Sequence, residues 1–132
     1  MAGYITDIIA QYEADLQMVK KYELSLRYVK EQTPELCLAA VQKNGLALEY
    51  VKKQTPEICL AAVQKNGYAL EYVIEQTPEI CLAAVQNKGW VLHCIKEQTP
   101  ELCLASVKQN RYALIYVKDL NLREKLILEL KL

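Results

Sequence analysis

The chain has 132 residues, enough for one domain, and its 52% hydrophobic and 24% charged residues are typical of a soluble folded protein. Sixteen Lys and Arg residues balance sixteen Asp and Glu residues, so the net charge argues against nucleic acid or an anionic membrane as a partner. No apolar run approaches the roughly 18 residues of a membrane span, and the segment from Met1 to Tyr12 lacks the pattern of a signal peptide. We therefore expect an intracellular protein.

A repeat of 22 residues runs through the whole sequence. Residues 46–67 read LALEYVKKQTPEICLAAVQKNG, residues 68–89 read YALEYVIEQTPEICLAAVQNKG, and the flanking segments align in the same frame without gaps. Runs that begin with proline stand where a leucine-rich repeat would show L-x-x-L-x-L, which favours helices. We predict a single all-α domain over 1–132, an α-solenoid of six stacked two-helix repeats with capping units at both ends. The units are 2–23, 24–45, 46–67, 68–89, 90–111 and 112–132.

The first helix of each unit has a start signal and a stop signal. Thr33 can cap the helix through its hydroxyl, Pro34 suits the first helical position, and Gly45 is expected to take the left-handed conformation that often ends a helix. Arg111 occupies the fourth glycine position, so we expect that turn to be either strained or built differently. The structural cap residues are Thr33, Pro34, Gly45, Thr55, Pro56, Gly67, Thr77, Pro78, Gly89, Thr99 and Pro100.

The second helix is expected from Leu46 to about Lys53. Because two turns are marginal alone, below the roughly 12–15 residues needed in water, tertiary contacts must hold it. The first helix is apolar almost all round, which predicts packing against neighbouring units on both sides. The terminal units are more polar, as capping repeats require. The leucine-rich tail 126–132 either folds onto the fifth unit as a capping helix or forms a dimerisation surface.

The repeated motif is Y-V-K-E-Q-T-P-E-[LI]-C-L-A-A-V-Q-K-N-G-x-A-L-E, and it covers 24–118 almost completely. It resembles a family of short helical repeats of unknown function, found mainly in giant DNA viruses of amoebae and some amoeba-associated bacteria. The resemblance implies action inside a host cell, in the host cytoplasm if the protein is viral. It implies no activity, cofactor or catalytic residue. A designed consensus array would also show near-identical units, but the inverted pair Asn87-Lys88 and the divergent ends favour a natural protein.

Recurring cysteines and a single histidine are the candidates for chemistry. Zinc ligands usually come as close pairs, and helices stacked roughly 8–10 Å apart exceed the ~7 Å limit for Cα atoms joined by a disulfide. We therefore expect buried small hydrophobes at these positions and no metal or cofactor. His93 adjoins Cys94, but neighbours on a helix point about 100° apart, so we expect no catalytic pair and no enzyme. The recurring cysteines are Cys37, Cys59, Cys81 and Cys103.

Some helical repeats read one nucleotide base per unit. A basic row is conceivable here because lysine recurs at one position, but acidic residues follow it directly. We therefore expect a solvated face of mixed charge and no nucleic-acid partner. The recurring lysines are Lys30, Lys52, Lys96 and Lys118, and the acidic residues that follow are Glu31, Glu75, Glu97 and Asp119.

Positions that change while the repeat frame stays constant are the candidates for function. If Glu49 and Lys52 mark the exposed side of the second helix, later units place apolar or aromatic groups on that side, as partner sites often do. The candidate partner-binding surface consists of Ile74, Trp90, His93 and Ile115. The alternative for the aromatic series is that Tyr68, Trp90 and Tyr112 fill gaps between repeats.

These features predict a non-enzymatic protein-interaction module whose partner protein is unknown. The alternative is a structural protein that self-associates as a homo-oligomer through its terminal helices. A nucleic-acid-binding helical repeat comes third.

Overall fold

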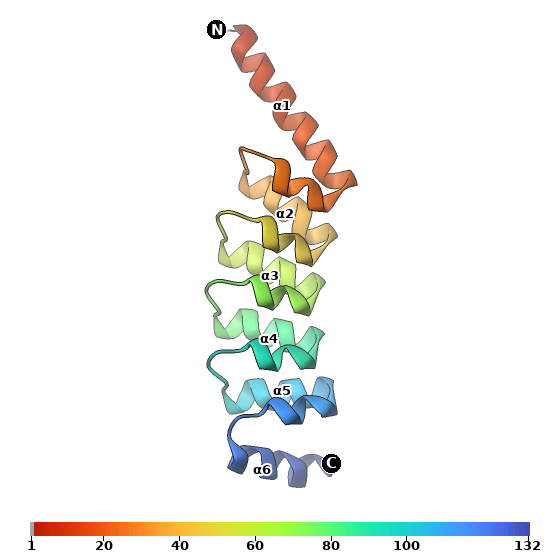
Figure 1. The fold of residues 1–132 in the computed structure, drawn as a ribbon, viewed down its shortest axis with the longest axis vertical. Coiled ribbons are helices and arrows are strands. Elements are labelled where there is room, and N and C mark those ends of the chain that lie inside the picture. The colour runs from red at the N-terminus through yellow and green to blue at the C-terminus, as the bar shows by residue number, and fades with distance from the viewer. Residues whose placement is uncertain (1) are drawn as a thin grey trace.

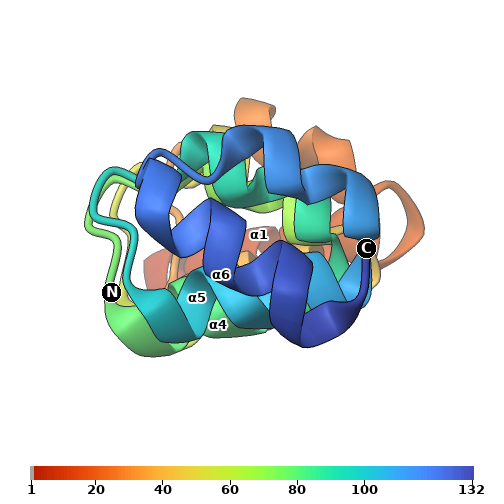
Figure 2. The same cartoon turned by 90° about the horizontal axis from the view of Figure 1, so that it is seen from below.

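The computed structural model describes residues 2–132, and every regular element among them is a helix. Each interior unit pairs an α-helix with a short 3-10 helix. The hairpins stack in one column, with the α-helices in one layer and the 3-10 helices in the other (Figures 1 and 2). The predicted α-solenoid is confirmed. The elements are α1 (Ala2–Lys21), η1 (Glu23–Tyr28), α2 (Pro34–Lys43), η2 (Gly45–Tyr50), α3 (Pro56–Lys65), η3 (Gly67–Tyr72), α4 (Pro78–Asn87), η4 (Gly89–Cys94), α5 (Pro100–Gln109), η5 (Arg111–Tyr116) and α6 (Leu120–Leu130).

The interior α-helices begin where the Thr-Pro pairs predict. The Thr33 hydroxyl accepts a hydrogen bond of 3.2 Å from the backbone N–H of Leu36, and Pro34 is the first helical residue. The same cap recurs at Thr55, Thr77 and Thr99. Because each cap satisfies an N–H that has no partner within the helix, the start of the helix is encoded locally.

The second element of each unit is a 3-10 helix of six residues, so the expectation of a helix from Leu46 to about Lys53 is wrong. The element η2 ends at Tyr50, and Val51 is extended, with φ −77° and ψ 116°. Lys52 therefore lies in the following loop. The chain leaves the helix here because Gln32 of the preceding unit holds the Tyr50 carbonyl and the Lys52 N–H.

Close packing between units, rather than backbone conformation, explains the recurring glycines. No glycine in the described chain has a positive φ, so the expectation of a left-handed turn at Gly45 is wrong. A Cβ atom on Gly45 would lie 2.3 Å from the carbonyl oxygen of Ala62 in the next unit. Arg111 begins η5 after an extended cap residue like the others, so its turn is neither strained nor built differently. The backbone of α6 approaches the preceding unit less closely, which leaves room for the exposed arginine.

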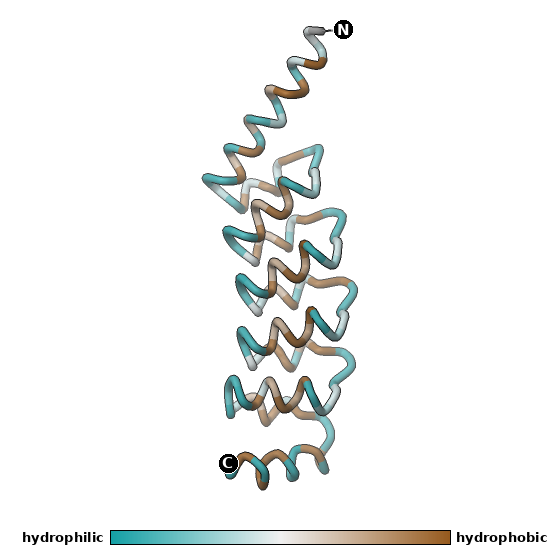
Figure 3. Tube along the Cα trace, turned by 180° about the vertical axis from the view of Figure 1, so that it is seen from behind, coloured by the Kyte–Doolittle hydropathy of each residue, from teal (hydrophilic) through white to brown (hydrophobic). Residues whose placement is uncertain are grey.

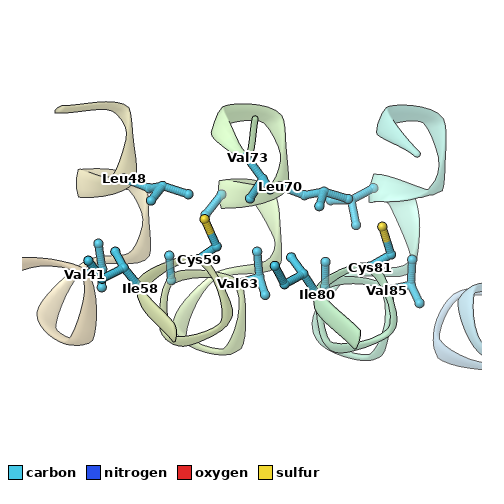
Figure 4. Packing of buried hydrophobic residues seen from close by; sticks show 14 of the residues in the cluster. Val41, Leu48, Ile58, Cys59, Val63, Leu70, Val73, Ile80, Cys81 and Val85 are labelled. Atoms are coloured by element: carbon cyan, nitrogen blue, oxygen red, sulfur yellow. The ribbon is translucent and has the colours of Figure 1, made fainter. Parts of the chain in front are cut away.

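The core is continuous between the two layers and along the stack. Figure 4 shows Val41 beside Ile58 of the next unit, and Val63 beside Ile80. Packing of the first helix on both sides is thus confirmed. The four recurring cysteines are buried and free, as expected of small hydrophobes.

The ends differ from the interior units. Residues 2–21 form one helix instead of two, because Ala10, Gln11 and Tyr12 stand where the other units have Gln-Thr-Pro. The N-terminal half of α1 extends beyond the stack (Figures 1 and 3). At the other end α6 folds onto the fifth unit, with Leu126 buried and Asp119 as the N-cap. The leucine-rich tail therefore serves as a capping helix.

Candidate interaction surface

Two of the four candidate residues lie in separate hollows of the surface. Ile74 is 69% exposed and lies in the loop after η3, where it lines a hollow with Gln54, Pro56 and Ile80. Ile115 is 62% exposed on η5. It lines a different hollow near the C-terminal end, with residues Tyr112, Ile127 and Leu132. Neither isoleucine fills a gap between repeats.

The other two candidates lie together with a tyrosine from the next unit. His93 Nδ1 lies 2.6 Å from the Trp90 carbonyl oxygen. The Trp90 ring meets Tyr116 edge-on, with centroids 5.3 Å apart, and the His93 ring lies 5.2 Å from the same tyrosine. We call Trp90, His93 and Tyr116 the aromatic cluster. Sequence reasoning missed Tyr116, although a recurring tyrosine at its position was the available signal.

Cys94 and His93 are in contact, so the expectation that their side chains point apart is wrong. The Cys94 Sγ lies 3.2 Å from His93 Nε2, because the histidine side chain is long enough to turn over its neighbour. Burial, and secondarily the charge of Glu71, raise the pKa of the Cys94 thiol. A nucleophilic cysteine needs a lowered pKa, so this pair lacks the activation that catalysis requires. Within residues 2–132 no group of three His, Cys, Asp or Glu side chains could hold a metal ion.

The exposed face of the 3-10 layer changes character along the stack. At its N-terminal end the guanidinium of Arg27 lies over the rings of Tyr28 and Tyr50, at 4.6 and 5.8 Å from their centroids. In the middle, Glu49 and secondarily the nearby Glu71 raise the pKa of Tyr72. The face then becomes aromatic at His93 and apolar at Ile115. One geometric frame therefore carries basic, acidic and apolar groups in sequence.

A row of glutamines fixes each unit against the next. Gln54 Nε2 donates to the Tyr72 carbonyl at 2.6 Å, and its Oε1 accepts from the Ile74 N–H at 3.0 Å. The same pair of bonds occurs at each interior boundary. Sequence reasoning missed this row, although the invariant glutamine before each Thr-Pro was a signal. We call it the glutamine ladder: Gln32, Gln54, Gln76 and Gln98.

Comparison with known proteins bears on the central repeats. Residues 33–76 match a family model described as a domain of unknown function, DUF4116. The match runs from the N-cap of α2 to the loop before α4, and it agrees with the resemblance of the repeat motif to a family without assigned activity. Neither the curated proteins nor the solved structures give a match. No helix within residues 2–132 is both long enough and apolar enough to span a membrane.

Proposed function

We propose that the chain is a non-enzymatic protein-interaction module that presents the exposed face of its 3-10 helices to another protein. The observation that carries the proposal is the aromatic cluster, in which Trp90 is half-buried against Tyr116 and His93 is exposed. Tryptophan and tyrosine are common anchors of protein interfaces. The glutamine ladder supports the same function, because a face held rigid before binding loses less entropy when a partner docks.

The variable column of the 3-10 layer supports recognition of a particular partner. Arg27, Glu49, Glu71, His93 and Ile115 occupy equivalent positions in successive units but differ in charge and polarity. Such a column can favour one partner and repel others, which is how charged interfaces obtain specificity. We further propose that the partner is met inside a cell, in a host cell if the chain comes from a giant virus or an amoeba-associated bacterium. Five free cysteines are consistent with a reducing compartment.

The test compares captured proteins between matched variants. The chain is immobilised, incubated with amoeba lysate, cross-linked and analysed by quantitative mass spectrometry. We expect the combined change of Trp90→Ala and Ile115→Lys to reduce capture of specific partners at least tenfold. Gln64→Ala with Gln86→Lys, at exposed positions of the α-helix layer, is the control and should capture the same partners as wild type. Ile74→Lys alone reports whether the separate hollow belongs to the same interface. Equal capture by wild type and the Trp90/Ile115 variant would reject the aromatic face.

Self-association is a second candidate, favoured by the bare face of α1. Ile5, Ile8 and Ile9 are each more than half exposed, and they continue the stripe by which Leu16 and Val19 pack on the stack. Spacings of three and four residues place these side chains on one side of the helix. A patch of this kind on a projecting helix is typical of an interaction surface.

The occupant that fits the α1 stripe is the C-terminal hollow of a second copy. That hollow is lined by Tyr112, Ile115 and Ile127, with Arg111 at its side. The helix α1 is acidic, with Asp7, Glu13 and Asp15 and no basic residue before its last two positions, Lys20 and Lys21. Such a head-to-tail contact would build rings or filaments. Light scattering over a concentration series tests it: mass should rise with concentration for wild type and not for Ile5→Lys with Ile8→Lys. A concentration-independent monomer for wild type would reject self-association.

A further inference from the structure

The zero net charge of the chain conceals a separation of charge between two edges of the stack. At one edge, on the right in Figure 1, each α-helix ends and the next 3-10 helix begins. Figure 3, seen from behind, shows hydrophilic residues at both edges and apolar residues between them. The residues of the first edge define what we call the basic edge: Lys20, Lys21, Lys43, Lys65, Lys88, Lys108, Arg111 and Lys131.

The opposite edge holds the loops and the helix N-termini, and acidic residues outnumber basic ones there. Its lysines are the row already considered in the sequence, and each stands beside carboxylates. The acidic residues of this edge are Glu31, Glu35, Glu57, Glu75, Glu79, Glu97, Glu101 and Asp119. A polyanion is therefore attracted to one side of the column and repelled from the other.

The cations of the basic edge are largely free to meet an external anion. Within residues 2–132, Lys43 is the one member of the edge with an acidic partner, Glu23 at 3.9 Å. Lysines near helix C-termini complement the helix dipole, but that end of a helix carries only about half a negative charge. Each rung of the edge thus keeps a net positive charge. Stacked helices place successive rungs roughly 8–10 Å apart, which makes a regular basic row along the column.

Exposed tyrosines lie along the same edge. Tyr22 is 60% exposed, Tyr68 45% and Tyr112 67%, and each follows the end of an α-helix directly or within three residues. The ammonium of Lys21 lies 5.4 Å from the centre of the Tyr22 ring. A positively charged track with interspersed aromatic rings is the arrangement by which proteins bind single strands, with phosphates on the cations and bases stacked on the rings.

We propose that the basic edge binds single-stranded nucleic acid. Lys65, Lys88 and Arg111 contact the phosphates, and Tyr68 and Tyr112 stack on bases. Duplex binds less well, because paired bases offer no free faces to the tyrosines. This surface is distinct from the aromatic cluster, so the proposal stands apart from the proposed function.

The experiment is a fluorescence-anisotropy titration of a fluorescein-labelled 15-nucleotide oligo-dT with the full chain, from 50 to 200 mM salt. The edge variant carries Lys65→Glu, Lys88→Glu, Lys108→Glu and Arg111→Glu. The matched control carries Lys30→Glu, Lys52→Glu, Lys96→Glu and Lys118→Glu, which change the net charge equally on the opposite edge. Circular dichroism and thermal melting of each variant verify the fold.

We expect wild type and control to bind within a factor of about two of each other, and the edge variant at least tenfold more weakly. The slope of log K against log salt should become shallower by about 0.7 for each phosphate contact removed. Tyr68→Ala with Tyr112→Ala should weaken binding about fivefold or more while the salt slope stays the same. The duplex of the same length should bind more weakly than the single strand.

Three results would overturn the proposal. One is the absence of oligonucleotide binding by wild type at 50 mM salt. Another is equal weakening by the edge variant and its control, which would indicate non-specific attraction. The third is binding to vesicles containing 30% phosphatidylserine without binding to oligo-dT, which would assign the edge to membranes. Loss of fold in the edge variant leaves the wild-type salt slope and the tyrosine variant to decide.

Discussion

Gln54 holds the backbone of Tyr72 across a repeat boundary, with its side-chain Nε2 2.6 Å from the Tyr72 carbonyl oxygen. The same amide accepts the N–H of Ile74 at 3.0 Å through its Oε1, which also faces the Cys59 thiol at 3.4 Å. These two backbone groups stand where η3 has ended and the chain turns toward the next α-helix. One side chain thus ends a 3-10 helix and joins it to the preceding unit.

Removing this amide should destabilise the stack. In Gln54→Ala the Tyr72 carbonyl and the Ile74 N–H lose their partners, and the free energy of unfolding should fall by about 1–3 kcal/mol. Urea denaturation followed by circular dichroism measures this change. Gln64→Ala is the control, because that side chain is exposed, and it should shift stability by less than about 0.5 kcal/mol. Hydrogen exchange adds a local reading: the Ile74 amide should exchange faster in Gln54→Ala. An unchanged exchange rate would show that the glutamine is not needed there.

Gly67 should tolerate no side chain. A Cβ atom at that position would lie 2.6 Å from the Ala84 carbonyl oxygen, so the units must separate to admit a methyl group. We expect Gly67→Ala to lower the free energy of unfolding by about 1–3 kcal/mol, as overpacking does. Gly3→Ala is the matched control, because nothing lies within 4 Å of its added Cβ and alanine favours a helix. It should be neutral or stabilising by up to about 1 kcal/mol. Equal effects of the two changes would contradict a role for close packing.

Arg123 should anchor the terminal helix. Its guanidinium donates to the carbonyls of Ile115 at 3.2 Å and Val117 at 2.7 Å, bonds that tie α6 to the end of η5. We expect Arg123→Ala to cost about 1.5–3 kcal/mol, as for hydrogen bonds to a charged group, and to speed exchange of the Leu126 amide. The control is Lys125→Ala, which removes only an exposed ion pair with Glu129 and should cost less than about 1 kcal/mol. If the Leu126 amide stays protected in Arg123→Ala, the apolar contacts alone hold the helix.

The buried thiols should make stability depend on alkaline pH. Burial raises the pKa of the Cys59 and Cys81 thiols above the 9.0 of an exposed cysteine. The unfolded chain therefore loses these protons at lower pH than the folded chain. The thiol contribution is fully present below about pH 9 and is lost as pH rises through the higher folded pKa. Urea midpoints measured between pH 7 and 10.5 should decline less steeply in Cys59→Ala with Cys81→Ala than in wild type. Parallel declines would remove the thiols as the cause.

The sequence by itself determined the architecture and the starts of the helices. The period of 22 residues is visible in the printed letters, and the capping of α2 by Thr33 and Pro34 depends only on residues within one turn of each other. The same holds for part of the candidate surface. Trp90 and His93 are three residues apart, and a contact between such near neighbours follows from local geometry.

Tertiary structure decided the features that depend on how units stack. The clamp from Gln54 to Tyr72 spans 18 residues, and the contact between Gly67 and Ala84 spans 17, so both exist only at the observed pitch between units. Stacking also brought Tyr116 to the aromatic cluster and placed Ile74 and Ile115 in separate hollows. It sorted the charges as well. The chain alternates lysine and glutamate along its length, but each hairpin reverses direction at the same place, so successive units deliver like charges to the same edge.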